Sequence, residues 1–155
     1  MTIKWAVIGA GGIADRRTIP ALIQDDSNLL VAIMDKSPDL AKTVGTKYNV
    51  PYYTDENLML DEIDCDAVYI STPVFCHYDQ AMLALKHDKH VFIEKPVGLD
   101  GVQSKQLLDA FKSAGKQLSV GYMMKYHNLH QKAKQILKDG GIGQVNSVRA
   151  QFTCW

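Results

Sequence analysis

Apolar and polar residues alternate along this chain in blocks of two kinds. Short blocks rich in apolar residues end at a glycine or a polar residue; they cover 3–8, 29–34, 67–70, 90–93 and 117–120, with a weaker one at 50–54. In the longer blocks between them, apolar residues recur every three or four positions, as in helices with one buried face. Strands that alternate with helices predict an α/β fold, a doubly wound parallel sheet of the Rossmann type.

Capping residues locate the expected helices along the chain. The helices are predicted at 14–23, 38–45, 55–60, from His77 onward, 100–115 and 129–137. Asp55 and Asp100 are suited to N-caps, because a carboxylate can accept hydrogen bonds from the first free N–H groups of a helix. Glycines at 45, 115 and 140 are suited to helix exits.

The last residues show the period of two that is typical of a strand. Val148, Ala150, Phe152 and Cys154 alternate with other residues and would form one apolar face. No later segment can pair with this strand, and natural domains avoid long unpaired apolar edges. We therefore expect a Rossmann domain at 1–121, a connecting helix at 122–143, and at 144–155 the first strand of a missing second domain. The tail is expected to pair with another copy or to pack back on its own domain.

Composition narrows the choice of partners and location. Among the 155 residues, Lys plus Arg and Asp plus Glu number 17 each, so the charge balance does not suggest a nucleic acid or an anionic membrane as partner. No apolar stretch approaches the length of a membrane span, and no signal peptide precedes the first apolar block. The three cysteines, Cys65, Cys76 and Cys154, form no C-x-x-C pair. Reduced thiols and a cytoplasmic location are expected.

A glycine-rich turn follows the first apolar block at once, with the sequence Gly9-Ala10-Gly11-Gly12-Ile13-Ala14. Gly9 allows a tight turn out of the strand, Gly11 allows the backbone to approach a pyrophosphate, and Ala14 lets the helix pack closely. The first helical turn offers free N–H groups and the positive end of its dipole to phosphates. An ordinary turn without a ligand is the alternative, but the strand and helix on either side favour dinucleotide binding.

An acidic residue about 20 residues past this motif also supports dinucleotide binding. Asp35 ends the second apolar block, where a carboxylate can accept hydrogen bonds from a ribose 2′-hydroxyl and would repel a 2′-phosphate. This favours NAD over NADP, although the neighbouring Lys36 can offset a phosphate and keeps NADP open. Alternatively, Asp35 is a turn or N-cap residue before Ser37 and Pro38.

Two further apolar blocks end in residues that can bind a ligand or take part in a reaction. Ser71, Thr72 and Pro73 close the third strand, where ligands of doubly wound sheets bind, so they are expected to meet the cofactor; turn chemistry around the proline is the alternative. His77 can orient a ligand, or it can have a capping or packing role.

Glu94-Lys95-Pro96 follows the strand at 90–93, and its charges must lie at the carboxyl edge of the sheet to stay solvated. Lys95 can hydrogen-bond the oxygen of an alcohol or carbonyl and share its proton, while Glu94 holds the lysine in place. Pro96 fixes the turn, and the Lys95–Pro96 bond can be cis. A surface salt bridge is the alternative.

Other clusters carry weaker signals. The acids at 61, 62, 64 and 66 fit a solvated loop better than a metal site, because no other candidate ligand converges on them. His127 and His130 are spaced to share a helix face, but no third ligand is near, so no metal site is expected. His127 also follows the segment 122–126 and can contact a substrate.

With these motifs in order, the chain resembles the N-terminal domain of the glucose–fructose oxidoreductase/inositol dehydrogenase family, often called Gfo/Idh/MocA. The matching pieces span nearly the whole chain: Gly9 to Ala14, Ile19-Pro20-Ala21-Leu22, Asp35, Ser71-Thr72-Pro73 with His77, His90 to Pro96, and Gly121-Tyr122 to Tyr126. One departure is Val74, where many relatives carry Asn after the Thr-Pro pair.

The resemblance implies roles for specific residues. Lys95 would be the active-site lysine, Gly9 to Ala14 the pyrophosphate loop, and Asp35 the adenosine-ribose contact. Thr72 and Pro73 would line the cofactor, and Glu94 would lie near the nicotinamide ribose. On the substrate side, the segment from Tyr122 through Met124 to Lys125 would approach the nicotinamide. The resemblance also implies a second α+β domain, truncated away here, that supplies substrate contacts, a further acid or base, and a dimer surface. The parent enzyme is therefore expected to be a homo-oligomer.

The sequence therefore predicts an NAD(P)-dependent oxidoreductase that transfers hydride between nicotinamide and a secondary alcohol or carbonyl, on a sugar or polyol. This chain alone is expected to bind the cofactor without full activity. A non-catalytic NAD-binding or sensor module is the main alternative, and Lys95 argues against it because binding alone does not require a lysine there. A methyltransferase with a similar glycine turn is a third possibility, which the Glu94-Lys95-Pro96 edge disfavours.

Overall fold

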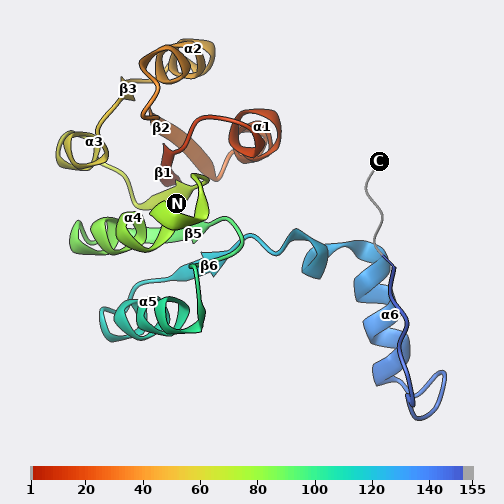
Figure 1. Ribbon diagram of the computed structural model, residues 1–155. Coiled ribbons are helices and arrows are strands. Elements are labelled where there is room, and N and C mark those ends of the chain that lie inside the picture. Colours follow the sequence, from red (N-terminus) through yellow and green to blue (C-terminus); the bar gives the residue numbers. More distant parts are fainter. Residues whose placement is uncertain (1, 152–155) are drawn as a thin grey trace. The chain divides into compact units, whose positions relative to one another are not determined.

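The computed structural model describes residues 2–151, which divide into two compact units between Gly121 and Tyr122. The first unit is a sheet with helices on both faces (Figure 1). Its elements are β1 Ile3–Ile8, η1 Ala14–Thr18, α1 Ile19–Ile23, β2 Asn28–Met34, α2 Pro38–Tyr48, β3 Tyr52–Tyr53, α3 Glu56–Glu62, β4 Ala67–Ile70, α4 Val74–Lys86, β5 His90–Ile93, α5 Gly101–Ser113 and β6 Leu118–Val120.

The six strands are all parallel and lie in the order β3-β2-β1-β4-β5-β6. The chain starts at the centre with β1, moves outward to β3, and returns to β4 beside β1 before moving outward again. This order confirms the predicted doubly wound Rossmann fold. The direction reverses between β1 and β4, so the carboxyl ends of these two strands flank the crevice where such folds bind ligands.

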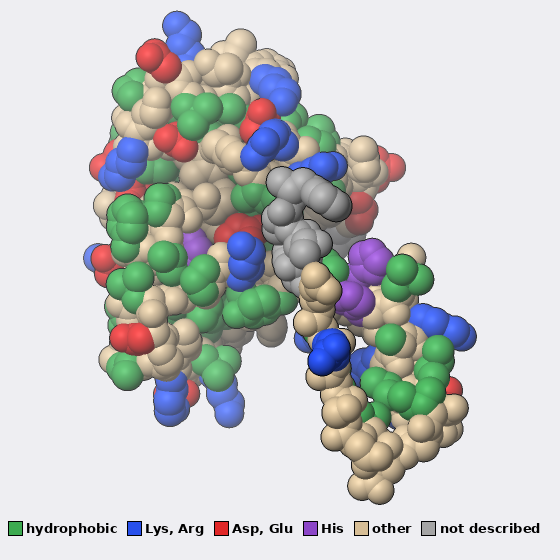
Figure 2. Space-filling view, turned by 45° about the vertical axis from the view of Figure 1, so that its right-hand side comes forward, with side chains coloured by type: hydrophobic (Ala, Val, Ile, Leu, Met, Phe, Trp, Pro, Cys, Tyr) green, Lys and Arg blue, Asp and Glu red, His purple; other side chains and the backbone are tan. Residues whose placement is uncertain are grey.

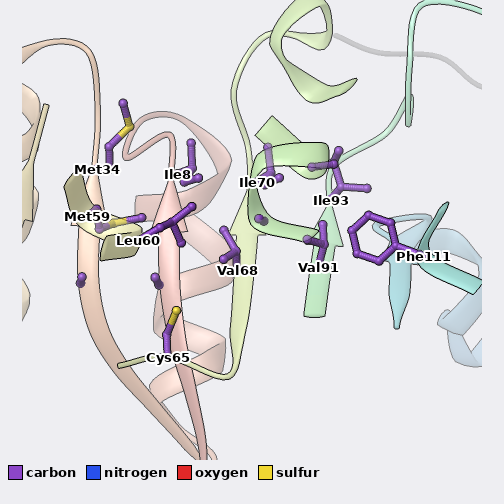
Figure 3. Packing of buried hydrophobic residues seen from close by; sticks show 14 of the residues in the cluster. Ile8, Met34, Met59, Leu60, Cys65, Val68, Ile70, Val91, Ile93 and Phe111 are labelled. Atoms are coloured by element: carbon purple, nitrogen blue, oxygen red, sulfur yellow. The ribbon is translucent and has the colours of Figure 1, made fainter. Parts of the chain in front are cut away.

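The two faces of the sheet bury alternate residues of the same strands. One face of β1, β4 and β5 packs Ile8, Ile70 and Ile93 against α3, α4 and α5 (Figure 3). The opposite face packs Val7 and Tyr69 against η1, α1 and α2. Burial on both faces explains why the strands read as apolar runs rather than as alternating patterns.

Two helix boundaries differ from the sequence prediction. Helix α2 does not end at Gly45 but continues to Tyr48, and Asn49 takes the left-handed conformation with φ of 54°. A Cβ on Gly45 would lie 2.7 Å from Cβ of Tyr52, so this glycine allows close packing of α2 on β3 instead of ending the helix. Helix α4 begins at Val74 rather than at His77, which places His77 one turn inside the helix.

The predicted helix at 14–23 is present, but its first part, η1, has π-helical hydrogen bonding. The N–H of Ile19 donates to the carbonyl of Ala14, five residues back. Pro20 accounts for this opening, because a proline ring clashes with the carbonyl four residues earlier and lacks an N–H to donate.

The sequence suggested one solvated loop for the acidic segment 61–66, but the structure divides this segment between a helix and the residues after it. Asp61 and Glu62 belong to α3, whereas Asp64 and Asp66 follow it. Each acid has its own partner: the four contacts are Asp61 with His87, Glu62 with Tyr53, Asp64 with Lys4, and Asp66 with the backbone N–H of Lys4. The carboxylates are therefore accounted for by local structure.

The second unit contains η2 Met123–Tyr126 and α6 Asn128–Lys138. The positive φ of Gly140, 73°, follows α6 where the sequence predicts its exit. Hydrophobic side chains gather on the visible face of this unit (Figure 2), and Leu129 and Val148 are among its exposed residues.

The strand predicted at 144–155 is not seen in residues 145–151, which belong to no helix or strand. A strand is stabilised by ladder hydrogen bonds to a partner, and no partner strand pairs with this segment among residues 2–151. Residues 152–155 lie outside the described part of the chain. The proposed contact of the tail with another copy or with its own domain stays a prediction.

The surface carries mixed charge, as the composition suggested. Figure 2 shows positive and negative side chains interspersed on the visible face of the first unit. Within residues 2–151, no helix combines the length and apolar character needed to cross a membrane.

Candidate cofactor-binding site

The glycine-rich loop leaves β1 in a conformation that requires glycine. Gly9 has φ of 93°, and its N–H donates to the carbonyl of Met34 at 2.8 Å. A Cβ on Gly9 would lie 2.9 Å from both the carbonyl carbon of Ser71 and the amide nitrogen of Thr72. The loop after β1 therefore touches the backbone of the loop after β4, at the point where the sheet order reverses.

Several N–H groups of this loop are left for a ligand, among them those of Gly11 and Gly12. The N–H of Ala10 donates to Asp35 and that of Ala14 donates to the carbonyl of Gly11. The N–H groups of Gly11 and Gly12 donate to no other residue within the described part of the chain. Free N–H groups in a glycine loop at the start of a helix suit the oxygens of a diphosphate, so the loop fits the predicted role.

Asp35 has the supporting contacts expected of a fixed residue. Its Oδ2 accepts from the N–H of Ala10 at 2.9 Å, and its Oδ1 accepts from the N–H of Ser37 at 2.9 Å. The second contact is the turn role that the sequence left as an alternative, and the first ties the end of β2 to the glycine loop. Because each carboxylate oxygen has a further lone pair, both roles leave room for ribose hydroxyls.

A cleft of about 610 Å³ lies beside this loop. Its volume is in the range of small-molecule sites. The loop after β1, the end of β2, the loop after β4, and the first turns of α3 and α4 line it: Gly9, Gly11, Met34, Asp35, Lys36, Glu56, Ser71, Thr72, Pro73, Phe75, Cys76, Asp79 and Gln80.

Ser71 and Thr72 line the cleft and also hold its walls together. The hydroxyl of Ser71 donates to the carbonyl of Gly9 at 2.7 Å, and the hydroxyl of Thr72 donates to Oε1 of Gln80 at 2.6 Å. Pro73 occupies the N-cap position of α4. These residues therefore combine the expected place at the cleft with the turn chemistry considered as an alternative.

His77 does not lie on the cleft. Its ring is buried, with Nδ1 2.8 Å from the carbonyl oxygen of Pro96 and Nε2 2.9 Å from that of Thr72. The ring thus joins the loop after β4 to the loop after β5. This is the packing role that the sequence left open, and His77 supports the site without lining it.

Glu94 is positioned by a buried tyrosine. The Tyr69 hydroxyl donates to Oε1 of Glu94 at 2.9 Å and accepts from the Thr18 hydroxyl at 3.0 Å. Burial, together with the hydrogen bond to Glu94, raises the pKa of Tyr69, so its hydroxyl stays protonated and able to donate. Gly121 adds a second constraint, because a Cβ there would lie 3.1 Å from Oε1 of Glu94.

Lys95 is exposed at the carboxyl edge of the sheet, next to Glu94. Its backbone N–H donates to Oε2 of Glu94 at 3.3 Å, and the Lys95–Pro96 peptide bond is cis, as the sequence allowed. Its side chain forms no ion pair with any residue in the range 2–151. The surface salt bridge considered as an alternative is therefore not seen, and the ammonium group is available to a ligand.

The predicted substrate-side residues belong to the second unit. Tyr122 and Met124 lie in or beside η2, and the side chain of His127 caps α6 by accepting from the N–H of Leu129 at 3.3 Å. The backbone carbonyl of Lys125 accepts from the amide of Gln131. Their role toward a substrate stays a prediction.

Several cleft residues were not foreseen from the sequence. Glu56 is the first residue of α3, and Phe75, Cys76, Asp79 and Gln80 lie in the early turns of α4. Placing the start of α4 at His77 left Phe75 and Cys76 outside the predicted helix. A capping signal at Asp55 located the start of α3 correctly, but nothing local showed that Glu56 faces the crevice.

Comparison with known proteins is consistent with this geometry. Residues 3–122 match the family described as "Oxidoreductase family, NAD-binding Rossmann fold". The chain belongs to the Gfo/Idh/MocA family. This membership confirms the resemblance inferred from the sequence and the prediction of a nicotinamide dinucleotide, NAD or NADP, as cofactor.

One curated relative of the chain is named as a reductase of a dTDP-linked sugar. The chain is 30% identical over 151 residues to dTDP-3,4-didehydro-2,6-dideoxy-alpha-D-glucose 3-reductase from Streptomyces antibioticus, covering 97% of this chain and 46% of the relative. Thus the chain spans about half the length of the curated relatives that it matches.

Solved structures share the fold. Scyllo-inositol dehydrogenase from Lactobacillus casei, with bound NAD(H) and scyllo-inositol, is 27% identical with a TM-score of 0.86, covering 92% of this chain and 43% of that one. A variant of a 3-ketoreductase from Actinomadura kijaniata, in complex with TDP-benzene and NADP, is 30% identical with a TM-score of 0.86, covering 94% and 46%.

Proposed function

We propose that these residues form the cofactor-binding part of an oxidoreductase that transfers hydride between a nicotinamide dinucleotide and a secondary alcohol or carbonyl of a sugar, polyol or related small molecule. The observation that carries the proposal is the unpaired Lys95 at the carboxyl end of β5, in the same sheet as the glycine loop. The sugar-related names of the relatives support the substrate class.

Lys95 and Glu94 have distinct parts in this proposal. The bound nicotinamide would supply or accept the hydride. The Lys95 ammonium would hydrogen-bond the substrate oxygen, donating a proton from Nζ to it in reduction and taking one in oxidation. Glu94, fixed by Tyr69, would orient Lys95 by accepting a hydrogen bond from its backbone N–H.

The second half of the proposal concerns the residues of the second unit. Tyr122, Met124, Lys125 and His127 would approach the substrate side of the nicotinamide. A homo-oligomeric parent enzyme in the cytoplasm is part of the same proposal. An NAD-binding sensor module without turnover remains the competing function, since the glycine loop and Asp35 would serve it equally well.

Titration calorimetry of the chain with NADH, NADPH and S-adenosylmethionine tests the binding part. We expect saturable binding of at least one reduced nicotinamide dinucleotide and none of S-adenosylmethionine. The Asp35→Ala variant should weaken NADH binding about tenfold, since it removes a charge-assisted hydrogen bond to the ribose and support for the loop. S-adenosylmethionine binding without NADH binding would point to a methyltransferase instead.

Turnover tests the catalytic part, on the complete natural polypeptide that contains residues 1–155. With NAD and a panel of inositols and glucosides, we expect substrate-dependent formation of NADH that falls at least about 100-fold in Lys95→Met, the scale of a lost general acid–base. Binding of NADH should stay within about threefold of wild type, because Lys95 is assigned to the substrate oxygen. Lys116→Met is the matched control, since Lys116 pairs with Asp88 outside the cleft. Equal turnover in Lys95→Met and wild type would refute the catalytic role of Lys95, whereas no turnover with any substrate, alongside normal NADH binding, would favour the sensor function.

A further inference from the structure

The end of β2 carries an ion pair that crosses to α3. The Lys36 ammonium lies 2.9 Å from Oε2 of Glu56, and both residues line the cleft beside Asp35. The Glu56 side chain is only 15% exposed, whereas that of Lys36 is 71% exposed. Oε2 of Glu56 is buried and has no well-aligned hydrogen-bond donor among the described residues, so the contact with Lys36 is an ion pair. The close contact with the Glu56 carboxylate raises the pKa of Lys36.

The pair changes the electrostatic character of the cleft. Among the described residues that line it, Asp35, Glu56 and Asp79 are acidic and Lys36 is the sole lysine or arginine. Because Glu56 already compensates Lys36, a ligand meets an excess of negative charge at this end. Moving the ammonium toward a ligand would leave a largely buried carboxylate without its partner, which is costly.

The two nicotinamide dinucleotides differ at this end of the molecule. NAD presents a neutral ribose 2′-hydroxyl, which can donate a hydrogen bond to the Asp35 carboxylate. NADP presents a phosphate monoester, which carries about −1.5 to −2 charge near pH 7. A phosphate beside Asp35 requires a free cation, and Lys36 is the nearest residue in sequence that can provide one.

We propose that Glu56 is a specificity-determining residue, which makes the cleft prefer NAD over NADP by holding Lys36 away from the 2′-phosphate. The inference rests on the proposed function, because it requires that a nicotinamide dinucleotide bind in this cleft with its adenosine ribose at Asp35. It goes further in assigning the preference to an acid on α3 rather than to Asp35 alone. Without Glu56, Lys36 would be free to pair with the phosphate and offset Asp35.

A double-mutant cycle tests this assignment. NADH and NADPH are titrated calorimetrically into the wild type, Glu56→Gln, Lys36→Gln and the double variant. Glu56→Gln keeps the shape of the side chain and should strengthen NADPH binding relative to NADH by about two- to fivefold, the scale of one partly exposed ion pair. In the Lys36→Gln background, the same Glu56→Gln change should give much less of this gain, because no lysine remains to be released.

Glu62→Gln is the matched control, since Glu62 lies on the same helix, accepts from the Tyr53 hydroxyl and does not line the cleft. The ratio of its affinity for NADPH to its affinity for NADH should equal that of the wild type. An unchanged ratio in Glu56→Gln would overturn the proposal, and so would a gain of equal size with and without Lys36, which would show a simple loss of negative charge. If neither dinucleotide binds any variant, including the wild type, the proposed function itself fails, and that outcome is distinct from both.

Discussion

Replacing Gly9 with alanine tests how closely the loop after β1 approaches the loop after β4. At Gly9 the backbone has φ of 93°, and an added Cβ would lie 2.9 Å from backbone atoms of Ser71 and Thr72. Backbone cannot move aside as a flexible side chain can. The substitution therefore brings two separate costs, one from conformation and one from overlap.

The magnitudes of the two costs can be estimated separately. Placing an L-residue in a left-handed conformation costs about 1–2 kcal/mol. Forcing a methyl group into a packed contact costs about 1–3 kcal/mol more. We expect Gly9→Ala to lower the free energy of unfolding by about 2–5 kcal/mol, which is a large part of the roughly 5–15 kcal/mol typical of a domain.

Equilibrium unfolding in urea measures this change, with Gly115→Ala as the control. Gly115 follows α5 with φ of 67°, and an added Cβ there meets nothing within 4 Å. Gly115→Ala should therefore show the conformational cost alone, about 1–2 kcal/mol. Equal losses for the two variants, or a loss below about 0.5 kcal/mol for Gly9→Ala, would refute the close approach of the two loops.

Two other substitutions test the core and the buried hydrogen bonds. Phe111→Ala removes a ring that packs α5 on the sheet and should cost about 3–5 kcal/mol, whereas Leu108→Ala on the same helix, 59% exposed, should change the urea midpoint little. Tyr69→Phe removes the hydroxyl between Thr18 and Glu94 and should cost about 1–3 kcal/mol. Because the pKa of Tyr69 is raised by burial, the unfolded chain loses this proton first, so wild-type stability should fall as pH rises above about 10 and fall less in Tyr69→Phe. An alkaline fall of the same size in both proteins would contradict this assignment.

The central strands of the sheet were predictable because both of their faces are largely buried. Such strands read as short apolar runs, and β1, β4 and β5 follow their runs to the residue. N-caps at Asp55 and Asp100 were also found from local chemistry, since a carboxylate there accepts from an N–H three residues on. These features depend on neighbours in the sequence.

Features that depend on distant partners were missed. Gly45 looks like a helix exit, but the close approach of Tyr52 is what requires a glycine there. Nothing near Glu56 in the sequence points to Lys36, because the two meet only after β2 and α3 pack together. The sequence left His77 open between orienting a ligand and a capping or packing role, and only the contacts of its ring with the Pro96 and Thr72 carbonyls decide for packing.

Amide chemical-shift mapping by NMR, with NAD titrated into the chain, tests the central claim most directly. The account predicts saturable shifts that are largest at the free N–H groups of Gly11 and Gly12, with smaller ones at Lys36 and Thr72 along the cleft. Shifts confined to residues outside the cleft, or no saturable shift at millimolar NAD, would contradict the assignment of this loop as the dinucleotide site.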